Sequence, residues 1–169
     1  MKKASGRVAF TGLLAALALS FSFLEGLIPP IPVLPPGAKL GLSNIVVLYA
    51  AGSLGLPAAL FLACLKGGFA LLTRGVTAGL LSISGGVLSA LVMWLLLQKT
   101  RASLSLVGVC GALSHNAAQL CAAWLLTSAA VVFYLPFLVL FGVLTGLLTG
   151  VVLKLTLPPL QRIERYLLQ

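Results

Sequence analysis

Long apolar runs separated by short polar or proline-rich segments dominate this chain. An α-helix rises 1.5 Å per residue, so about 20 apolar residues are needed to cross about 30 Å of hydrocarbon. Run length, together with the glycine, proline and polar residues between the runs, predicts membrane spans at about 8–28, 42–55, 57–73, 80–97, 104–130 and 133–155, with 156–169 as a tail.

The stretch from Leu42 to Thr73 is ambiguous, because it is long for one helix and short for two. A turn over 52–57 (Gly-Ser-Leu-Gly-Leu-Pro) would divide it and give six spans. Most basic residues would then face the cytoplasm: Lys2, Lys3, Arg7, Lys99, Arg101, Lys154, Arg162 and Arg165. Without the turn, every basic residue from Lys99 onward would move outside, against the cytoplasmic bias of Lys and Arg. We therefore predict six transmembrane helices with both termini in the cytoplasm.

Two segments near the first span need separate interpretation. Ala16-Leu17-Ala18 resembles a signal-peptidase site, but the apolar run continues to Ile28, which favours a retained helix. The following loop, 29–37, is too proline-rich for a helix, because each ring removes a donor and fixes φ.

The carboxyl-terminal end combines a helix-breaking signal with an amphipathic pattern. Pro158-Pro159 is predicted to end the last span. The tail after it mixes charged residues with Leu160, Ile163 and Leu167 at helical spacing, so it is predicted to lie on the cytoplasmic interface.

Composition agrees with a membrane protein and excludes a soluble domain. Hydrophobic residues make up 60% of the 169 residues, charged residues 8%, and the mean hydropathy is +1.18, whereas soluble domains carry about a quarter charged residues. The formal charge is +9. Because the basic residues lie between apolar runs and form no long cluster with stacking aromatics, nucleic-acid binding is not expected.

Small residues form two stripes at helical spacing. One comprises Gly142, Gly146 and Gly150 in the 133–155 span, and the other comprises Gly12, Ala16 and Ser20 in the 8–28 span. Small residues let membrane helices approach closely. The stripes therefore indicate either packing within the bundle or a docking face for another membrane subunit, and the sequence leaves both readings open.

Polar residues within the spans are costly in lipid and are therefore functional candidates. With six spans, one group shares a depth between the bilayer midplane and the outer surface: Glu25, Lys39, Asn44, Lys66, Arg74, His115, Asn116 and Gln119. This shared depth predicts an outward-facing cavity that favours an anionic or strongly hydrogen-bonding ligand. Individually, Lys66 could snorkel, the His115 and Gln119 side chains could bond neighbouring helices, and Lys39 and Arg74 could be solvated loop charges.

The sequence lacks the residues that several kinds of catalysis and metal binding require. There is no nucleotide-binding loop of the G-x-x-x-x-G-K-[ST] type, and the two carboxylates, Glu25 and Glu164, lie far apart. One histidine and the scattered Cys64, Cys110 and Cys121 provide no metal-ligand spacing. We expect no catalysis by this chain alone, no metal and no cofactor.

Three segments resemble a known family. They are Gly37-Ala38-Lys39-Leu40-Gly41-Leu42-Ser43-Asn44, the Gly85-Gly86 pair and Ser114-His115-Asn116-Ala117-Ala118-Gln119, accompanied by a basic residue at 66. Nearly the whole chain resembles the Gx transporter family, often labelled heptaprenyl diphosphate synthase component I. That family is similar to the substrate-binding S components of energy-coupling factor (ECF) transporters.

The resemblance implies a bacterial cell-membrane protein with a six-helix S-component-like bundle. It implies a micronutrient site under the loop after the first span, and docking of a transmembrane T component, served by two ATPases, through Gly12 and Ala16. Lys39, Asn44, Lys66, His115, Asn116 and Gln119 would line or gate the cavity. The alternatives are a membrane accessory subunit of isoprenoid or quinone metabolism and a partner of a flavin-linked redox system.

Overall fold

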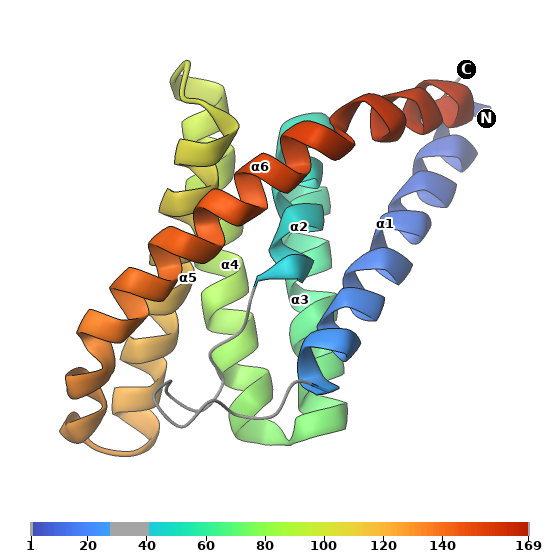
Figure 1. The fold of residues 1–169 in the computed structure, drawn as a ribbon. Coiled ribbons are helices and arrows are strands. Elements are labelled where there is room, and N and C mark those ends of the chain that lie inside the picture. Colours follow the sequence, from blue (N-terminus) through green and yellow to red (C-terminus); the bar gives the residue numbers. More distant parts are fainter. Residues whose placement is uncertain (1, 28–40, 169) are drawn as a thin grey trace.

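The computed structural model describes residues 2–27 and 41–168, and in these ranges the chain is helical, with no strand. The described residues form six α-helices and one 3-10 helix (Figure 1): α1 (Lys2–Leu27), α2 (Leu42–Ser53), α3 (Leu56–Arg74), α4 (Val76–Lys99), α5 (Leu104–Leu126), η1 (Ala129–Tyr134) and α6 (Leu135–Leu168). The predicted turn over 52–57 is confirmed: α2 ends at Ser53, and Gly55, at φ 90°, precedes α3.

Five of these helices are long and apolar enough to cross a membrane: α1, α3, α4, α5 and α6. The sixth, α2, has 12 residues, which is about 18 Å of helix and well short of a bilayer's hydrocarbon thickness. Every residue of α2 from Ile45 to Ala51 is buried. This short helix is therefore enclosed by protein over most of its length.

The central position of α2 organises the bundle. It contacts each of the other five α-helices, while α3, α4, α5 and α6 pack in sequence, each against the next. Both termini lie at one end of the bundle, beside the final turns of α6 (Figure 1). The α3–α4 and α5–α6 connections lie at the opposite end (Figure 1).

One polar link ties α2 to the carboxyl-terminal part of α6. The Tyr49 hydroxyl donates a hydrogen bond of 2.6 Å to Oε2 of Glu164, and the Tyr49 ring meets Phe10 of α1 edge to face, with centroids 6.0 Å apart. Leu160 and Leu167 also pack against the core. The tail is therefore anchored to the bundle by specific contacts.

The prediction that Pro158-Pro159 ends the last helix is wrong, since α6 runs through both prolines to Leu168. Each proline removes one helical N–H donor, and its ring crowds the carbonyl four residues earlier, so a helix that continues through it is kinked. Both rings are exposed, and α6 changes direction over its last third (Figure 1). The helix thus accommodates the prolines by bending, and the contacts of its tail hold it in place.

The predicted span 104–130 also extends too far, because α5 ends at Leu126. The Thr127 hydroxyl donates to the carbonyl of Ala123 at 2.7 Å. Such local bonds of threonine compete with continued helix. The chain then forms η1 before α6 begins.

The two small-residue stripes have different surroundings. A Cβ added to Gly146 would collide with the backbone of Val109, and one added to Gly150 with the backbone of Ser105, so α5 and α6 are in backbone contact along this stripe. Gly12, Ala16 and Ser20 are instead exposed, and a Cβ on Gly12 would meet nothing within 4 Å. The α1 stripe therefore lies on the outer surface of the bundle.

This difference predicts opposite effects for the same substitution. Gly146→Ala should lower the free energy of unfolding by about 1–3 kcal/mol, because α5 must move away from α6. The matched change Gly12→Ala should be neutral or slightly stabilising, because it adds a methyl group in open space on a helix. Thermal unfolding of the purified variants in detergent measures both, and equal melting temperatures would contradict the packing described here.

Candidate functional site

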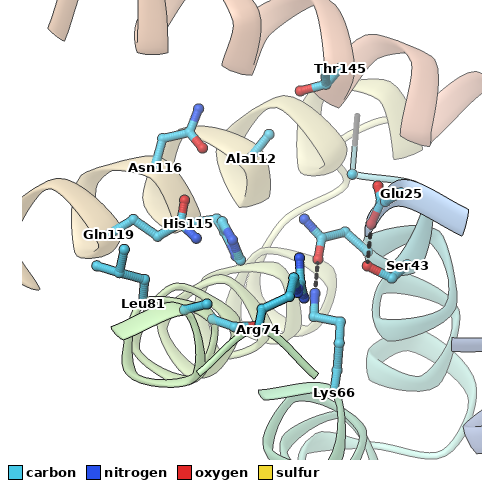
Figure 2. A pocket seen from close by; sticks show the side chains of 14 residues that line it. Glu25, Ser43, Lys66, Arg74, Leu81, Ala112, His115, Asn116, Gln119 and Thr145 are labelled. Atoms are coloured by element: carbon cyan, nitrogen blue, oxygen red, sulfur yellow. Dashed lines mark hydrogen bonds between the residues drawn. The ribbon is translucent and has the colours of Figure 1, made fainter. Parts of the chain in front are cut away.

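A polar cavity of about 50 Å³ lies inside the bundle (Figure 2). Its 14 lining residues come from all six α-helices and from the residue before α2. They are Glu25, Gly41, Ser43, Asn44, Lys66, Arg74, Ala78, Leu81, Ser82, Ala112, His115, Asn116, Gln119 and Thr145. The cavity therefore lies where the first turn of α2 meets the other helices.

The polar residues that were predicted to share one depth in the membrane surround this cavity. All of the predicted binding residues line it except Lys39, which lies outside the described residues. In Figure 2, Lys66 and Arg74 of α3 face His115 and Gln119 of α5 across the space, and Glu25 of α1 lies beside Ser43. The structure thus brings together predicted binding residues as distant in the sequence as Glu25 and Gln119.

Glu25 uses both carboxylate oxygens to hold the start of α2. Its Oε1 accepts from the backbone N–H of Leu42 at 2.6 Å, and its Oε2 accepts from the Ser43 hydroxyl at 3.1 Å. The N-cap residue, Gly41, has φ 79° and no side chain to cap the helix. A carboxylate is favourable at a helix N-terminus, where free N–H groups and the helix dipole meet it. Glu25 of α1 therefore supplies the cap that α2 lacks.

Lys66 places a buried ammonium in the wall of the cavity. The residue is 4% exposed, and its Nζ donates a hydrogen bond of 2.6 Å to Oδ1 of Asn44. An ammonium has three donors, so the bond to Asn44 fixes its position and accounts for one of them. The same bond joins α3 to the first turn of α2.

Arg74 ends α3 and extends into the cavity (Figure 2). Its Nη2 is buried and has no hydrogen-bond partner among the described residues. A buried guanidinium donor without a partner is costly, and a ligand oxygen would satisfy it.

The α5 residues have different surroundings. The His115 ring lies directly on α4 at Gly85, where a Cβ would be 2.8 Å from ring atoms. The Asn116 amide donates at 2.8 Å to the carbonyl of Leu138 in α6. Asn116 therefore also joins two helices, and Gly85 provides the space that His115 needs.

Sequence reasoning missed several lining residues, namely Gly41, Ser43, Ser82 and Thr145, as well as the role of Gly85. Small hydroxyl residues occur throughout the apolar helices, so none of these stands out by type. Gly41 and Gly85 lie in the segments that carry the family resemblance, which is the one signal that could have drawn attention to them.

The charges of the site favour an anion. Of the described residues, two with cationic side chains, Lys66 and Arg74, line the cavity beside one carboxylate, Glu25, whose oxygens are already bonded to α2. Charge-assisted hydrogen bonds to an anionic oxygen are stronger than neutral ones. In the ranges 2–27 and 41–168, no three His, Cys, Asp or Glu side chains gather as metal ligands would.

The Lys66–Asn44 pair predicts an asymmetry in stability. Asn44→Ala should lower the free energy of unfolding by about 1–3 kcal/mol or more, because it leaves a buried ammonium without its acceptor. Lys66→Met should be neutral or stabilising, since replacing a buried charge with an apolar side chain of similar length removes its desolvation cost. Combining the two changes should then cost less than Asn44→Ala alone.

Thermal unfolding of the three variants in detergent, without added ligand, measures this asymmetry. A Lys66→Met protein that unfolds several degrees below the unchanged chain would contradict it and would make Lys66 a structural residue.

Comparison with known proteins identifies a family. No curated protein and no solved structure matches this chain. A family model described as heptaprenyl diphosphate synthase component I matches residues 14–156, which include α2 to α5 and every described cavity residue. The chain therefore belongs to the heptaprenyl diphosphate synthase component I family, the Gx transporter family.

Proposed function

We propose that this chain is the substrate-binding membrane subunit, similar to an S component, of an ECF-type micronutrient transporter. It binds a small anionic or amphipathic solute in the polar cavity. The observation that carries this proposal is the polar cavity itself, in which Lys66, Arg74 and Asn44 meet His115 and Gln119 inside an apolar bundle. Polar groups are retained in such surroundings mainly where they serve a ligand or a transport path.

The arrangement of the helices supports an outward-facing site with six crossings and both termini in the cytoplasm of a bacterial cell. Glu25 and Arg74 lie in the last turns of α1 and α3, at the end of the bundle away from the termini (Figure 1). The end that carries the termini is the basic one, with Arg7, Lys99, Arg101, Arg162 and Arg165. Basic residues favour the cytoplasmic side.

Energy for transport would come from partners. The sequence contains no P-loop motif, which favours a binding subunit served by separate ATPases over an enzyme. The exposed stripe of Gly12, Ala16 and Ser20 on α1 would dock a transmembrane T component, because small residues allow a second helix to approach the backbone.

The description of the family favours a second candidate, a membrane accessory subunit of heptaprenyl diphosphate metabolism. Both carboxylates of the chain have structural bonds, Glu25 to α2 and Glu164 to Tyr49. In that setting the chain would therefore bind a prenyl compound for another subunit. Deletion of the gene should then change the length of the prenyl chains or the quinone content of the cell, and unchanged lipids would remove this candidate.

The transporter proposal predicts that docking and solute binding can be separated by mutation. Gly12→Leu should abolish co-purification with a co-expressed T component, because the side chain fills the space for the partner helix. Gly68→Leu is the matched control, since a Cβ at Gly68 of α3 also meets nothing within 4 Å. It should leave co-purification unchanged.

Lys66→Gln should have the converse effect, so that the complex still assembles but transports less. ATP-dependent solute uptake by cells should fall by about tenfold or more, because a buried charged hydrogen bond to the solute is lost. The readouts are affinity purification of the complex and uptake from a micronutrient-limited medium. A chain that assembles with no T component and supports no solute uptake would contradict the proposal.

A further inference from the structure

A second hollow adjoins the polar cavity. It is a crevice of about 130 Å³ between α1 and α3, lined by Ser22, Phe23, Gly26, Leu27, Phe69, Thr73 and Arg74. Arg74 lines both the crevice and the polar cavity. The two spaces therefore share Arg74 in their walls.

The crevice differs in character from the cavity. Phe23, Leu27 and Phe69 supply apolar walls, whereas ten of the 14 residues that line the cavity have polar or charged side chains. Phe23, Gly26, Leu27 and Thr73 are exposed, so the crevice opens on the outer surface of the bundle between α1 and α3. In a membrane-spanning bundle this surface faces lipid.

Two buried polar atoms on residues that line the crevice have no hydrogen-bond partner among the described residues. The Ser22 hydroxyl is 1% exposed and, like Nη2 of Arg74, makes no hydrogen bond with the described residues. Leaving such groups unsatisfied in an apolar setting costs about 1–3 kcal/mol each. An occupant that carries oxygen atoms near its charged end would satisfy both donors.

The volumes limit what the polar cavity can hold. Since a water molecule needs about 10–15 Å³ of such space, the cavity of about 50 Å³ has room for roughly four waters, or for one phosphate or carboxylate group. The remainder of a larger solute must lie elsewhere, and the crevice, with about 130 Å³ of such space, shares Arg74 with the cavity.

We propose that the site takes an anionic amphiphile: its phosphate or carboxylate group lies in the polar cavity against Lys66 and Arg74, and its apolar chain lies in the crevice between α1 and α3. This inference rests on the proposed function and names the class of its solute. It also gives the solute a lateral route to the membrane, because the crevice opens between two lipid-facing helices.

The test uses a photoactivatable n-dodecyl phosphate with a diazirine on its terminal carbon. The full chain is placed in nanodiscs of phosphatidylcholine, illuminated with the probe, and digested, and the labelled residues are located by mass spectrometry. Labelling should concentrate on residues 22–27 and 69–73 and should fall by about tenfold or more in Lys66→Gln, the loss expected when one charged hydrogen bond to the phosphate is removed. Dodecyltrimethylammonium should not compete.

Two matched variants separate the crevice from the cavity. Gly26→Phe adds a side chain to the crevice at an exposed glycine where a Cβ meets nothing within 4 Å, and Gly68→Phe makes the same change outside both hollows. Gly26→Phe should weaken competition by n-dodecyl phosphate about tenfold, while n-butyl phosphate keeps its affinity within about twofold, because the chain contributes by burial of its methylenes. Gly68→Phe should change neither.

The outcomes distinguish the amphiphile inference from the proposal of anion binding on which it rests. Lys66-dependent labelling outside the crevice, or equal effects of Gly26→Phe and Gly68→Phe, would overturn the amphiphile inference and leave an anion-binding subunit. Labelling that is unaffected by Lys66→Gln would overturn the inference together with anion binding in the cavity.

Discussion

The structure depends on how a short, buried helix obtains polar partners inside an apolar bundle. The first N–H groups of a helix have no partner within it, and no water is available in hydrocarbon to supply one. Glu25 reaches from α1 to the backbone of Leu42 and the hydroxyl of Ser43, and Asn44 accepts from Lys66 of α3. These bonds tie α2 to α1 and α3, and α2 also contacts every other α-helix.

The polar cavity is a consequence of that arrangement. The helix α2 is too short to fill the bundle from end to end. The space at its N-terminal end is therefore lined by side chains from α3, α4, α5 and α6. Glu25 is bonded to α2, so among the described residues the charges that remain available to a solute are those of Lys66 and Arg74. The same cap that secures α2 thereby gives the cavity its preference for anions. The close contact of α5 with α6 through Gly146 and Gly150 keeps the far wall in place.

Much of this could be predicted from the sequence, because in a membrane protein length and polarity are strong constraints. Run length located the long helices, and the Gly-Pro segment at 52–57 located the turn that precedes α3. The shared depth of Glu25, Lys66 and His115 predicted that they would surround one space, which the structure contains. Their role in binding stays a prediction.

The features that were missed depend on contacts between distant segments. The bond between Tyr49 and Glu164 holds the tail of α6 against the bundle, and no local pattern announces a pair 115 positions apart. A prediction that does not know of this bond places the end of the helix at Pro158-Pro159, because proline usually breaks or kinks a helix. The burial of α2 on all sides and the crevice beside Ser22 likewise follow from packing, not from local sequence.

The central claim is that the cavity is open to the outside and selects anions through Lys66. A chain whose native cysteines, Cys64, Cys110 and Cys121, are replaced and which carries Gln119→Cys can be labelled in intact cells with membrane-impermeant thiol reagents of opposite charge. The account predicts labelling from outside, faster with an anionic sulfonate reagent than with a cationic ammonium reagent, and loss of that preference when Lys66→Gln is added. Labelling that occurs only after the cytoplasmic face is exposed, or a preference for the cationic reagent, would contradict it.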